Sequence, residues 1–173
     1  MSAPPPSFAL RPWRTDDLPD LVRWADDADI ASNLTNTFPH PYTEADGIAF
    51  LNRFRNDAPV RVFAIVVDDH AVGSIGVFPQ DDIFHRNAEL GYWLAAPFRG
   101  RGIVPAAIRQ VVDYAFLSWP LHRVFARPFG SNRSSQRALE KAGFTLEARL
   151  AGTIEKNGRI EDELIYAVRR PSH

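Results

Sequence analysis

The chain has 173 residues, of which 45% are hydrophobic; this is enough to bury a core in one domain and excludes a largely disordered protein. It has no cysteine, which excludes disulfides, thiolate metal sites and a cysteine nucleophile, and its five histidines show no metal-binding spacing. The formal net charge of −1 gives no global reason to expect nucleic acid or an anionic membrane as a partner, and with no apolar run of membrane-spanning length and no N-terminal leader we expect a cytoplasmic protein.

The beginning of the chain predicts a short tail followed by a strand and a helix. Residues 1–7 contain three consecutive prolines and predict a flexible tail, whereas residues 8–173 predict a single domain. A strand is expected over 8–14. Thr15 is then expected to cap a helix whose apolar residues recur at helical spacing as far as Ala25.

The next segment predicts an irregular connection and a second helix. Residues 30–42 are rich in aromatic and proline residues and are expected to be irregular. Thr43 is followed three residues later by Asp46, which is typical of a helix start. The apolar residues of this helix are expected on its buried side: Ile48, Phe50, Leu51 and Phe54.

The rest of the chain alternates between strands and helices. It predicts, in order, strands over 61–67, 71–78 and 88–94, a helix over 102–117, a strand over 124–126, a helix over 133–142, and strands over 145–155 and 160–168. Gly143 is a typical residue just after a helix end. Asn157-Gly158 is the strongest short hairpin signal and joins the last two strands. The order predicts a mixed α/β domain.

A glycine-containing loop between a strand and a helix predicts an anion-binding site. The first amides of a helix have no intrahelical partner and point outward with the positive end of the dipole, and glycine lets a phosphate approach the backbone. Here the loop reads Arg99-Gly100-Arg101-Gly102, and Pro105 suits a first helical turn. A Rossmann or Walker motif is excluded, because residue 105 is proline and no Gly-Lys-Ser/Thr occurs. The glycines could also serve only to make a tight turn.

The charges are unevenly distributed along the chain. Residues 1–98 contain seven basic and fourteen acidic residues, whereas residues 99–149 contain nine basic and three acidic residues. This distribution reflects either compositional drift or a middle segment that faces an anion.

Two motifs resemble a known family. The loop pattern Arg99-x-x-Gly102-x-Val104 resembles the acyl-CoA loop of the GCN5-related N-acetyltransferases, which have glycine or alanine in place of Val104. The block that runs from Asn132 through Ser135 to Glu140-Lys141-Ala142-Gly143-Phe144 resembles a helix of the RimJ/RimL-like ribosomal-protein N-acetyltransferases. The resemblance covers about residues 8–168. It implies a twisted, mostly antiparallel seven-stranded sheet with flanking helices and with strands splayed at the acyl-CoA site.

The resemblance implies acetyl-CoA as the cofactor and an amine as the acceptor. Backbone groups of Trp93 and Leu94 would meet the pantetheine arm, and Asn132 would either contact that arm or cap its own helix. The loop amides would hold the pyrophosphate, and they come from Arg99, Gly100, Arg101, Gly102, Ile103 and Val104. The side chains of Arg99, Arg101, Arg133 and Arg137 could face the phosphates.

The resemblance also implies candidates for the chemistry. The amide of Leu94 would meet the thioester oxygen. Many family members have a tyrosine where this chain has Leu139, so Ser135 is expected to contact the thiol instead. Glu89 is the first candidate for the base, with Glu155, Asp162 and Glu163 after it. A water could also take the proton, because an α-amino group with a pKa near 8 is already partly neutral.

The acceptor pocket is expected near residues 37–42. Phe38, His40, Tyr42 and Glu155 are the candidate acceptor-binding residues, although the aromatic residues could equally pack in the core. Because there is no cysteine to carry an acyl group, direct transfer in a ternary complex to a protein N-terminus or a small-molecule amine is favoured. The alternative is a non-catalytic acyl-CoA-binding sensor or interaction module. A nucleotide-phosphate enzyme of another kind is disfavoured. Whether the chain forms a homodimer stays open.

Overall fold

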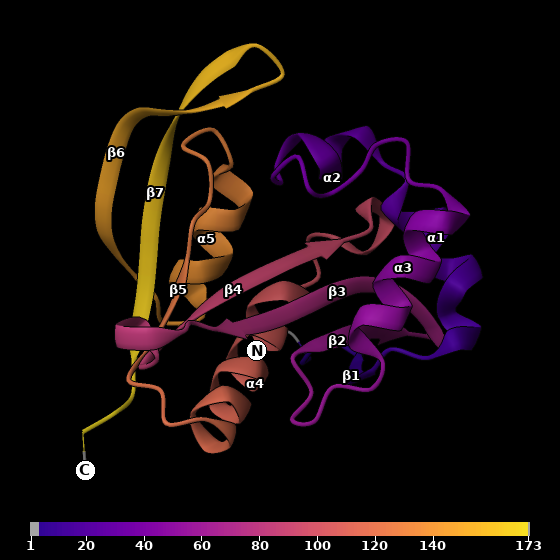
Figure 1. Ribbon diagram of the computed structural model, residues 1–173, viewed down its shortest axis with the longest axis horizontal. Helices are drawn as coiled ribbons and strands as arrows, with labels where there is room; N and C mark the ends of the chain where they lie inside the picture. The colour runs from indigo at the N-terminus through magenta and orange to yellow at the C-terminus, as the bar shows by residue number, and fades with distance from the viewer. Residues whose placement is uncertain (1–3, 173) are drawn as a thin grey trace.

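The structure is a computed structural model that describes residues 4–172 and is built around one seven-stranded sheet (Figure 1). The strands are β1 (Ala9–Pro12), β2 (Val62–Val67), β3 (His70–Pro79), β4 (Asn87–Leu94), β5 (Arg123–Ala126), β6 (Thr145–Lys156) and β7 (Arg159–Arg169). The helices are α1 (Leu18–Ala25), α2 (Ala28–Ser32), α3 (Glu44–Phe54), α4 (Ile103–Ser118) and α5 (Arg133–Lys141), with short 3-10 turns at Thr15–Asp17, Asp82–Phe84 and Ala96–Phe98. The expected mixed α/β fold is confirmed.

The sheet opens between its two central strands. The strand order is β1-β2-β3-β4-β5-β7-β6, and every neighbouring pair is antiparallel except β4 and β5. These two parallel strands pair only over residues 87–89 and 123–125. Beyond Glu89, β4 continues to pair with β3 as far as Leu94, but no strand within residues 4–172 pairs with its other edge. The expected splay is therefore present in the middle of the sheet.

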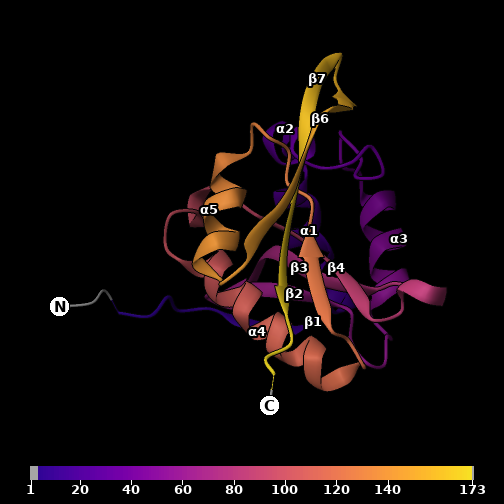
Figure 2. The same cartoon turned by 90° about the vertical axis from the view of Figure 1, so that its left-hand side faces the viewer.

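Two apolar clusters lie on opposite faces of the sheet, and β4 contributes to both. Side chains alternate across a strand, so Leu90 and Leu94 pack with the α4 residues of one cluster, whereas Trp93 packs with α1 and α3 in the other. Figure 2 shows α3 and α5 on opposite sides of the sheet. Packing on both faces of the sheet therefore holds the free edge of β4 in place.

Capping and turn residues predicted several element boundaries correctly. Thr43 and Asp46 form the expected capping box at the start of α3. Asn157 and Gly158 have the positive φ angles, 51° and 74°, that a tight hairpin turn requires. Gly143, with φ of 93°, follows the end of α5. Residues 4–8 contain no helix or strand, and residues 1–3 of the expected tail lie outside the described residues.

Three local predictions were wrong. Thr15 does not cap a helix, because Asp17 accepts the Arg14 amide at 2.8 Å and the 3-10 turn Thr15–Asp17 precedes α1. The segment 30–42 is not wholly irregular, because it begins inside α2, whose first amides are capped by the Asp27 carboxylate. Ile48 is 44% exposed rather than buried, and the small Gly47 takes the place facing α1.

In the part of the chain from residue 4 to residue 172, no helix is both long and apolar enough to cross a lipid bilayer.

Candidate active site

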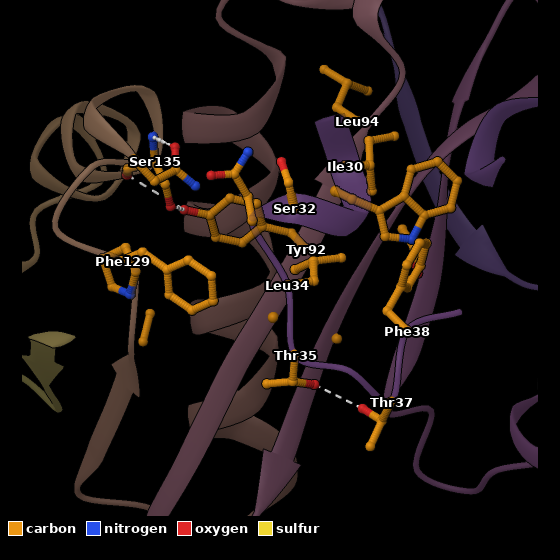
Figure 3. A pocket seen from close by; sticks show the side chains of 18 of the residues that line it. Ile30, Ser32, Leu34, Thr35, Thr37, Phe38, Tyr92, Leu94, Phe129 and Ser135 are labelled. Carbon is orange, nitrogen blue, oxygen red and sulfur yellow. Dashed lines mark hydrogen bonds between the residues drawn. The ribbon is translucent and has the colours of Figure 1, made fainter. Parts of the chain in front are cut away.

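A cleft of about 1130 Å³ lies where β4 diverges from β5. One side is formed by β4 and by the segment from Ala126 to Ser135, and the other by α2, α3 and the connection between them. The tip of the β6–β7 hairpin closes one end through Lys156 and Arg159. Figure 3 shows Tyr92 and Ser135 on one side of this pocket, with Thr35, Thr37 and Phe38 on the other.

The free edge of β4 presents backbone groups to the cleft. The Ala95 amide donates to Val72 of β3 at 2.9 Å. Because amides alternate in direction along a strand, the amide and carbonyl of Leu94 point away from β3 and toward the opening, as do those of Tyr92. The backbone groups of Trp93 point toward β3 instead. The backbone groups of Leu94 therefore point in the expected direction, and those of Trp93 do not. The groups that share the direction of Leu94 are those of Tyr92.

The loop before α4 is shaped by two left-handed glycines. Gly100 and Gly102 have φ angles of 75° and 77°, which a residue with a side chain rarely adopts. Among residues 4–172, a Cβ on Gly100 would meet no atom within 4 Å, and one on Gly102 would meet only Pro6 at 4.0 Å. The turn thus requires glycine, and both positions are open to a ligand. The following amides, of Ile103 and Val104, begin α4 and have no intrahelical partner.

The two arginines of the loop are already engaged within the protein. Arg99 donates from Nε to the Leu94 carbonyl at 3.0 Å and from Nη1 to Asp29 at 2.8 Å. Arg101 donates to the Pro97 carbonyl at 3.1 Å and lies over the Phe98 ring. These contacts hold the loop against the end of β4 and against α2. What the loop offers an anion is therefore mainly its backbone.

Ser135 lies in the cleft and is held by two neighbours. The Asn132 side chain accepts from the Ser135 amide at 3.2 Å, so Asn132 caps α5, as one of its two expected roles requires. The Tyr92 hydroxyl lies 2.5 Å from the Ser135 Oγ atom (Figure 3). Burial raises the pKa of Tyr92 to about 12, so its phenol is neutral at physiological pH.

Tyr92 was missing from the sequence interpretation. It is separated from Ser135 by 43 residues, and no local motif links the two. The available signal was strand alternation, which places Tyr92 on the same face of β4 as Leu90 and Leu94. That face is the one covered by α4 and α5.

The expected acidic residues are paired with arginines. Arg127 contacts both oxygens of Glu89, at 2.9 and 3.3 Å, and also reaches Glu163 at 3.3 Å. Asp162 is paired with Arg149 at 2.7 Å. Glu89 does line the cleft, but its carboxylate is already paired with Arg127, which it shares with Glu163.

The register of the β6–β7 hairpin decides which of its acids face the cleft. Lys156 pairs with Arg159, and Ile154 pairs with Glu161, so these four share one face. Glu155 pairs with Ile160 on the opposite face and does not line the cleft. Glu161 does line it and accepts from the Ser131 hydroxyl at 2.8 and 2.6 Å. Glu161 was missed because only the register distinguishes it from Glu155.

Of the four expected acceptor residues, Phe38 and Tyr42 line the cleft, whereas His40 and Glu155 do not. Phe38 packs against Tyr42 and Trp93, with ring centroids 5.4 and 6.3 Å apart. Tyr42 is only 5% exposed and belongs largely to the core. His40 lies outside the lining, 3.6 Å from Asp26. Within residues 4–172, no group of three potential metal ligands comes together.

The comparisons with known proteins agree with this geometry. Residues 8–145 match the family model described as "Acetyltransferase (GNAT) domain". The Bacillus subtilis protein named "Probable N-acetyltransferase YjcK" is 38% identical over 104 residues, which span 60% of this chain but only 58% of that protein. The "Spermidine N(1)-acetyltransferase" of Vibrio cholerae is 30% identical over 72% of this chain and 73% of its own length.

A solved structure extends the likeness to the whole fold. Mycobacterium smegmatis RimJ, solved in complex with CoA-disulfide, has a TM-score of 0.77 and 27% identity, and the match covers 94% of this chain and 81% of RimJ. The family match spans strands β1 to β5 and the glycine loop, and it ends at Thr145, the first residue of β6. The chain belongs to the GNAT acetyltransferase family.

Proposed function

We propose that this chain is an N-acetyltransferase that moves an acetyl group from acetyl-CoA directly to a primary amine. The observation that carries the proposal is the free edge of β4, which ends in a glycine loop at the start of α4. Membership of the family, the acetyltransferase names of its relatives and the CoA-disulfide bound to RimJ support it. We extend it to one catalytic domain over residues 8–173 in a cytoplasmic protein.

The residues present suit acetyl-CoA. Gly100 and Gly102 are exposed and leave room beside the loop backbone, so the amides from Arg99 to Val104 would hold a pyrophosphate. The outward-facing amide and carbonyl of Tyr92 would pair with the amides of a pantetheine arm as a further strand would, whereas the Leu94 carbonyl already accepts from Arg99. Asn132 keeps its side-chain NH₂ group available, because only its oxygen caps α5.

The chemistry needs a donor for each atom that gains negative charge. When bound, acetyl-CoA supplies the acetyl group as a thioester. The Leu94 amide is assigned to the thioester oxygen and the Ser135 hydroxyl to the sulfur. Tyr92 acts as a positioning residue: when its hydroxyl donates to Ser135 Oγ, the hydrogen of Ser135 is free to point into the cleft.

We assign contact with the acceptor amine to Glu161 rather than to Glu89. Glu161 faces the cleft and is bonded to Ser131, with no basic partner in the part of the chain that is described, whereas Arg127 neutralises Glu89. A carboxylate that is not neutralised favours a nearby ammonium and can accept its proton. Glu161 therefore holds the amine, and a water carries the proton onward where the amine is weakly basic.

Two measurements test the proposed function together. Calorimetry measures acetyl-CoA binding, and release of CoA is followed with a panel of peptides, amino acids and polyamines. Binding accompanied by turnover of at least one amine is expected. Binding without turnover of any amine would favour the non-catalytic acyl-CoA-binding module, and no binding at millimolar acetyl-CoA would contradict both readings.

A further inference from the structure

Most of the carboxylates that line the cleft are already paired with an arginine or cap a helix. Asp29 is paired with Arg99, and Glu89 is paired with Arg127. The carboxylate of Asp46 accepts from both the amide and the hydroxyl of Thr43. Among the described residues that line the cleft, Glu161 is the one carboxylate that neither pairs with a basic residue nor caps a helix. Glu161 is thus the lining carboxylate best placed to contact an ammonium group of the acceptor.

The same cleft contains basic side chains that lack an acidic partner. In the chain from residue 4 to residue 172, no carboxylate lies within 4.0 Å of the charged atoms of Arg53, Lys156 or Arg159. Lys156 donates to the Asn36 Oδ1 atom at 2.8 Å, which joins the hairpin tip to the connection between α2 and α3. It uses one of three ammonium hydrogens in doing so.

Lys156 and Arg159 are positioned beside Glu161. Lys156 and Arg159 are cross-strand partners, and Glu161 follows Arg159 by two residues on the same face of β7. Residues two apart on a strand are separated by about 6.6 Å. One end of the cleft therefore presents two cations and one anion within the span of a single small molecule or of one terminal residue of a peptide.

Part of the opposite wall is apolar, beside polar residues such as Thr35, Thr37 and Arg53. Phe38 and Phe50 are half-buried, Trp93 is nearly buried, and all three line the cleft. A polyamine would bring several charges to this wall and to the two cations, and both are unfavourable. The exposed glycines of the loop before α4, which suit the phosphates, do not line this part of the cleft, so the hairpin cations are free for the acceptor.

We propose that the acceptor is a primary monoamine that carries a carboxylate on an apolar body. The amine lies at Glu161, the carboxylate lies at Lys156 and Arg159, and the apolar part lies against Phe38. This inference rests on the proposed function and adds the class of its acceptor. An amino acid and a short peptide with a free carboxylate share this chemistry, and the assay separates them.

The test uses acceptors that differ in one group. The specificity constant kcat/KM is measured from CoA release at saturating acetyl-CoA for phenylalanine, phenylalaninamide, the dipeptide Phe-Glu, its diamide and spermidine. Each carboxylate is expected to be preferred over its amide by about tenfold, as for a charge-assisted hydrogen bond, and spermidine is expected to be the poorest acceptor. The larger of the two carboxylate effects identifies an amino acid or a peptide.

The variant Lys156→Gln/Arg159→Gln should bring the carboxylate-to-amide ratio close to one while acetyl-CoA affinity is unchanged. Arg86→Gln is the control for the loss of a positive charge: it removes one such charge, where the double variant removes two, but from an exposed turn outside the cleft, and should leave the ratio as in the wild type. A wild-type ratio near one, a preference for spermidine, or an equal loss for all amines in the double variant would overturn the inference. Failure to acetylate any amine despite acetyl-CoA binding would overturn the proposed function itself.

Discussion

One side of the cleft offers a ligand mainly backbone groups, and the other side offers mainly side chains. On the side of β4 and α4, the groups offered to a ligand are backbone amides and carbonyls on the free strand edge and in the loop with Gly100 and Gly102. On the side of α3 and the β6–β7 hairpin they are side chains, among them Phe38, Glu161 and Lys156. Backbone groups do not depend on residue identity, so the donor side can stay the same while substitutions change the acceptor.

The difference explains what the relatives share and where they differ. The names of the relatives agree on acetyl transfer, and one of them is named a spermidine N(1)-acetyltransferase. In this chain two of the acids that line the cleft, Asp29 and Glu89, are paired with arginines, whereas Glu161 has no such partner within residues 4–172. Substitutions on the two sides should therefore affect different measured constants.

The largest expected effect is on the donor side, from Gly102→Glu. The substitution forces a side chain into a left-handed conformation, with φ of 77°, and adds an anion beside the loop amides. We expect acetyl-CoA affinity measured by calorimetry to fall by about 100-fold or more. Gly143→Glu is the control, because it has the same charge and a left-handed φ of 93° but lies after α5. If both variants bind acetyl-CoA equally well, the loop has no part in the site.

Ser135→Ala tests whether this residue, which lies between the two sides of the cleft, acts in turnover or in acetyl-CoA binding. The hydroxyl lies in the cleft 2.5 Å from the Tyr92 oxygen, and its proposed role toward the sulfur matters only as negative charge develops. We expect kcat to fall by about 30-fold, while the Kd for acetyl-CoA changes by less than about twofold. An equal loss in kcat and in affinity would instead make Ser135 a binding residue.

Glu161→Gln should act on the acceptor side alone. The variant removes the charge but keeps a group that can accept from Ser131, so the hairpin is expected to stay in place. The value of kcat/KM for the amine should fall by about tenfold, with acetyl-CoA affinity unchanged. Glu155→Gln, on the outer face of the same hairpin, is the matched substitution and should retain wild-type values. The reverse result would mean that the hairpin register places Glu155, not Glu161, at the acceptor.

Predictions from the sequence succeeded where a few neighbouring residues determine the structure. The Thr43–Asp46 capping box and the Asn157-Gly158 turn depend on residues within one turn of each other. The Asp27 cap of α2 was equally local, but α2 is only five residues long and was hidden by the aromatic segment that follows it. Short elements with weak periodicity are the ones that such patterns miss.

The chemistry of the cleft could not be predicted in the same way, because it depends on long-range pairing. The free edge of β4 exists because β5 pairs with it over only three residues and ends at Ala126. The contact of Tyr92 with Ser135 and the pairing of Glu89 with Arg127 follow from that divergence. Choosing Glu161 over Glu155 required the hairpin register, in which a shift of one residue exchanges the two faces.

Tyr92→Phe should have the smallest effect on catalysis. The phenyl ring fills the same space, and Ser135 keeps its hydroxyl but loses the neighbour that orients it. We expect kcat to fall by about threefold to fivefold, which corresponds to the loss of one neutral hydrogen bond, with KM for acetyl-CoA unchanged. Because the pKa of Tyr92 is raised to about 12, its ionisation does not contribute to the activity profile between pH 6 and 9, and that profile should keep its shape in Tyr92→Phe. A changed profile would make the phenol a proton donor instead of a positioning group.

The same raised pKa predicts how stability responds to alkali. Burial favours the neutral phenol in the folded protein, so its stabilising contribution is complete below pH 10, the usual tyrosine pKa, and is lost as the pH rises from 10 to about 12. Tyr42, whose pKa burial also raises to about 12, contributes in the same direction. Tyr92→Phe removes one of these two contributions, so its free energy of unfolding in urea should fall less steeply between pH 9.5 and 11 than that of the wild type. Equal slopes would show that Tyr92 is exposed to solvent, and the hydrogen bond to Ser135 could then not be sheltered enough to orient the serine hydroxyl.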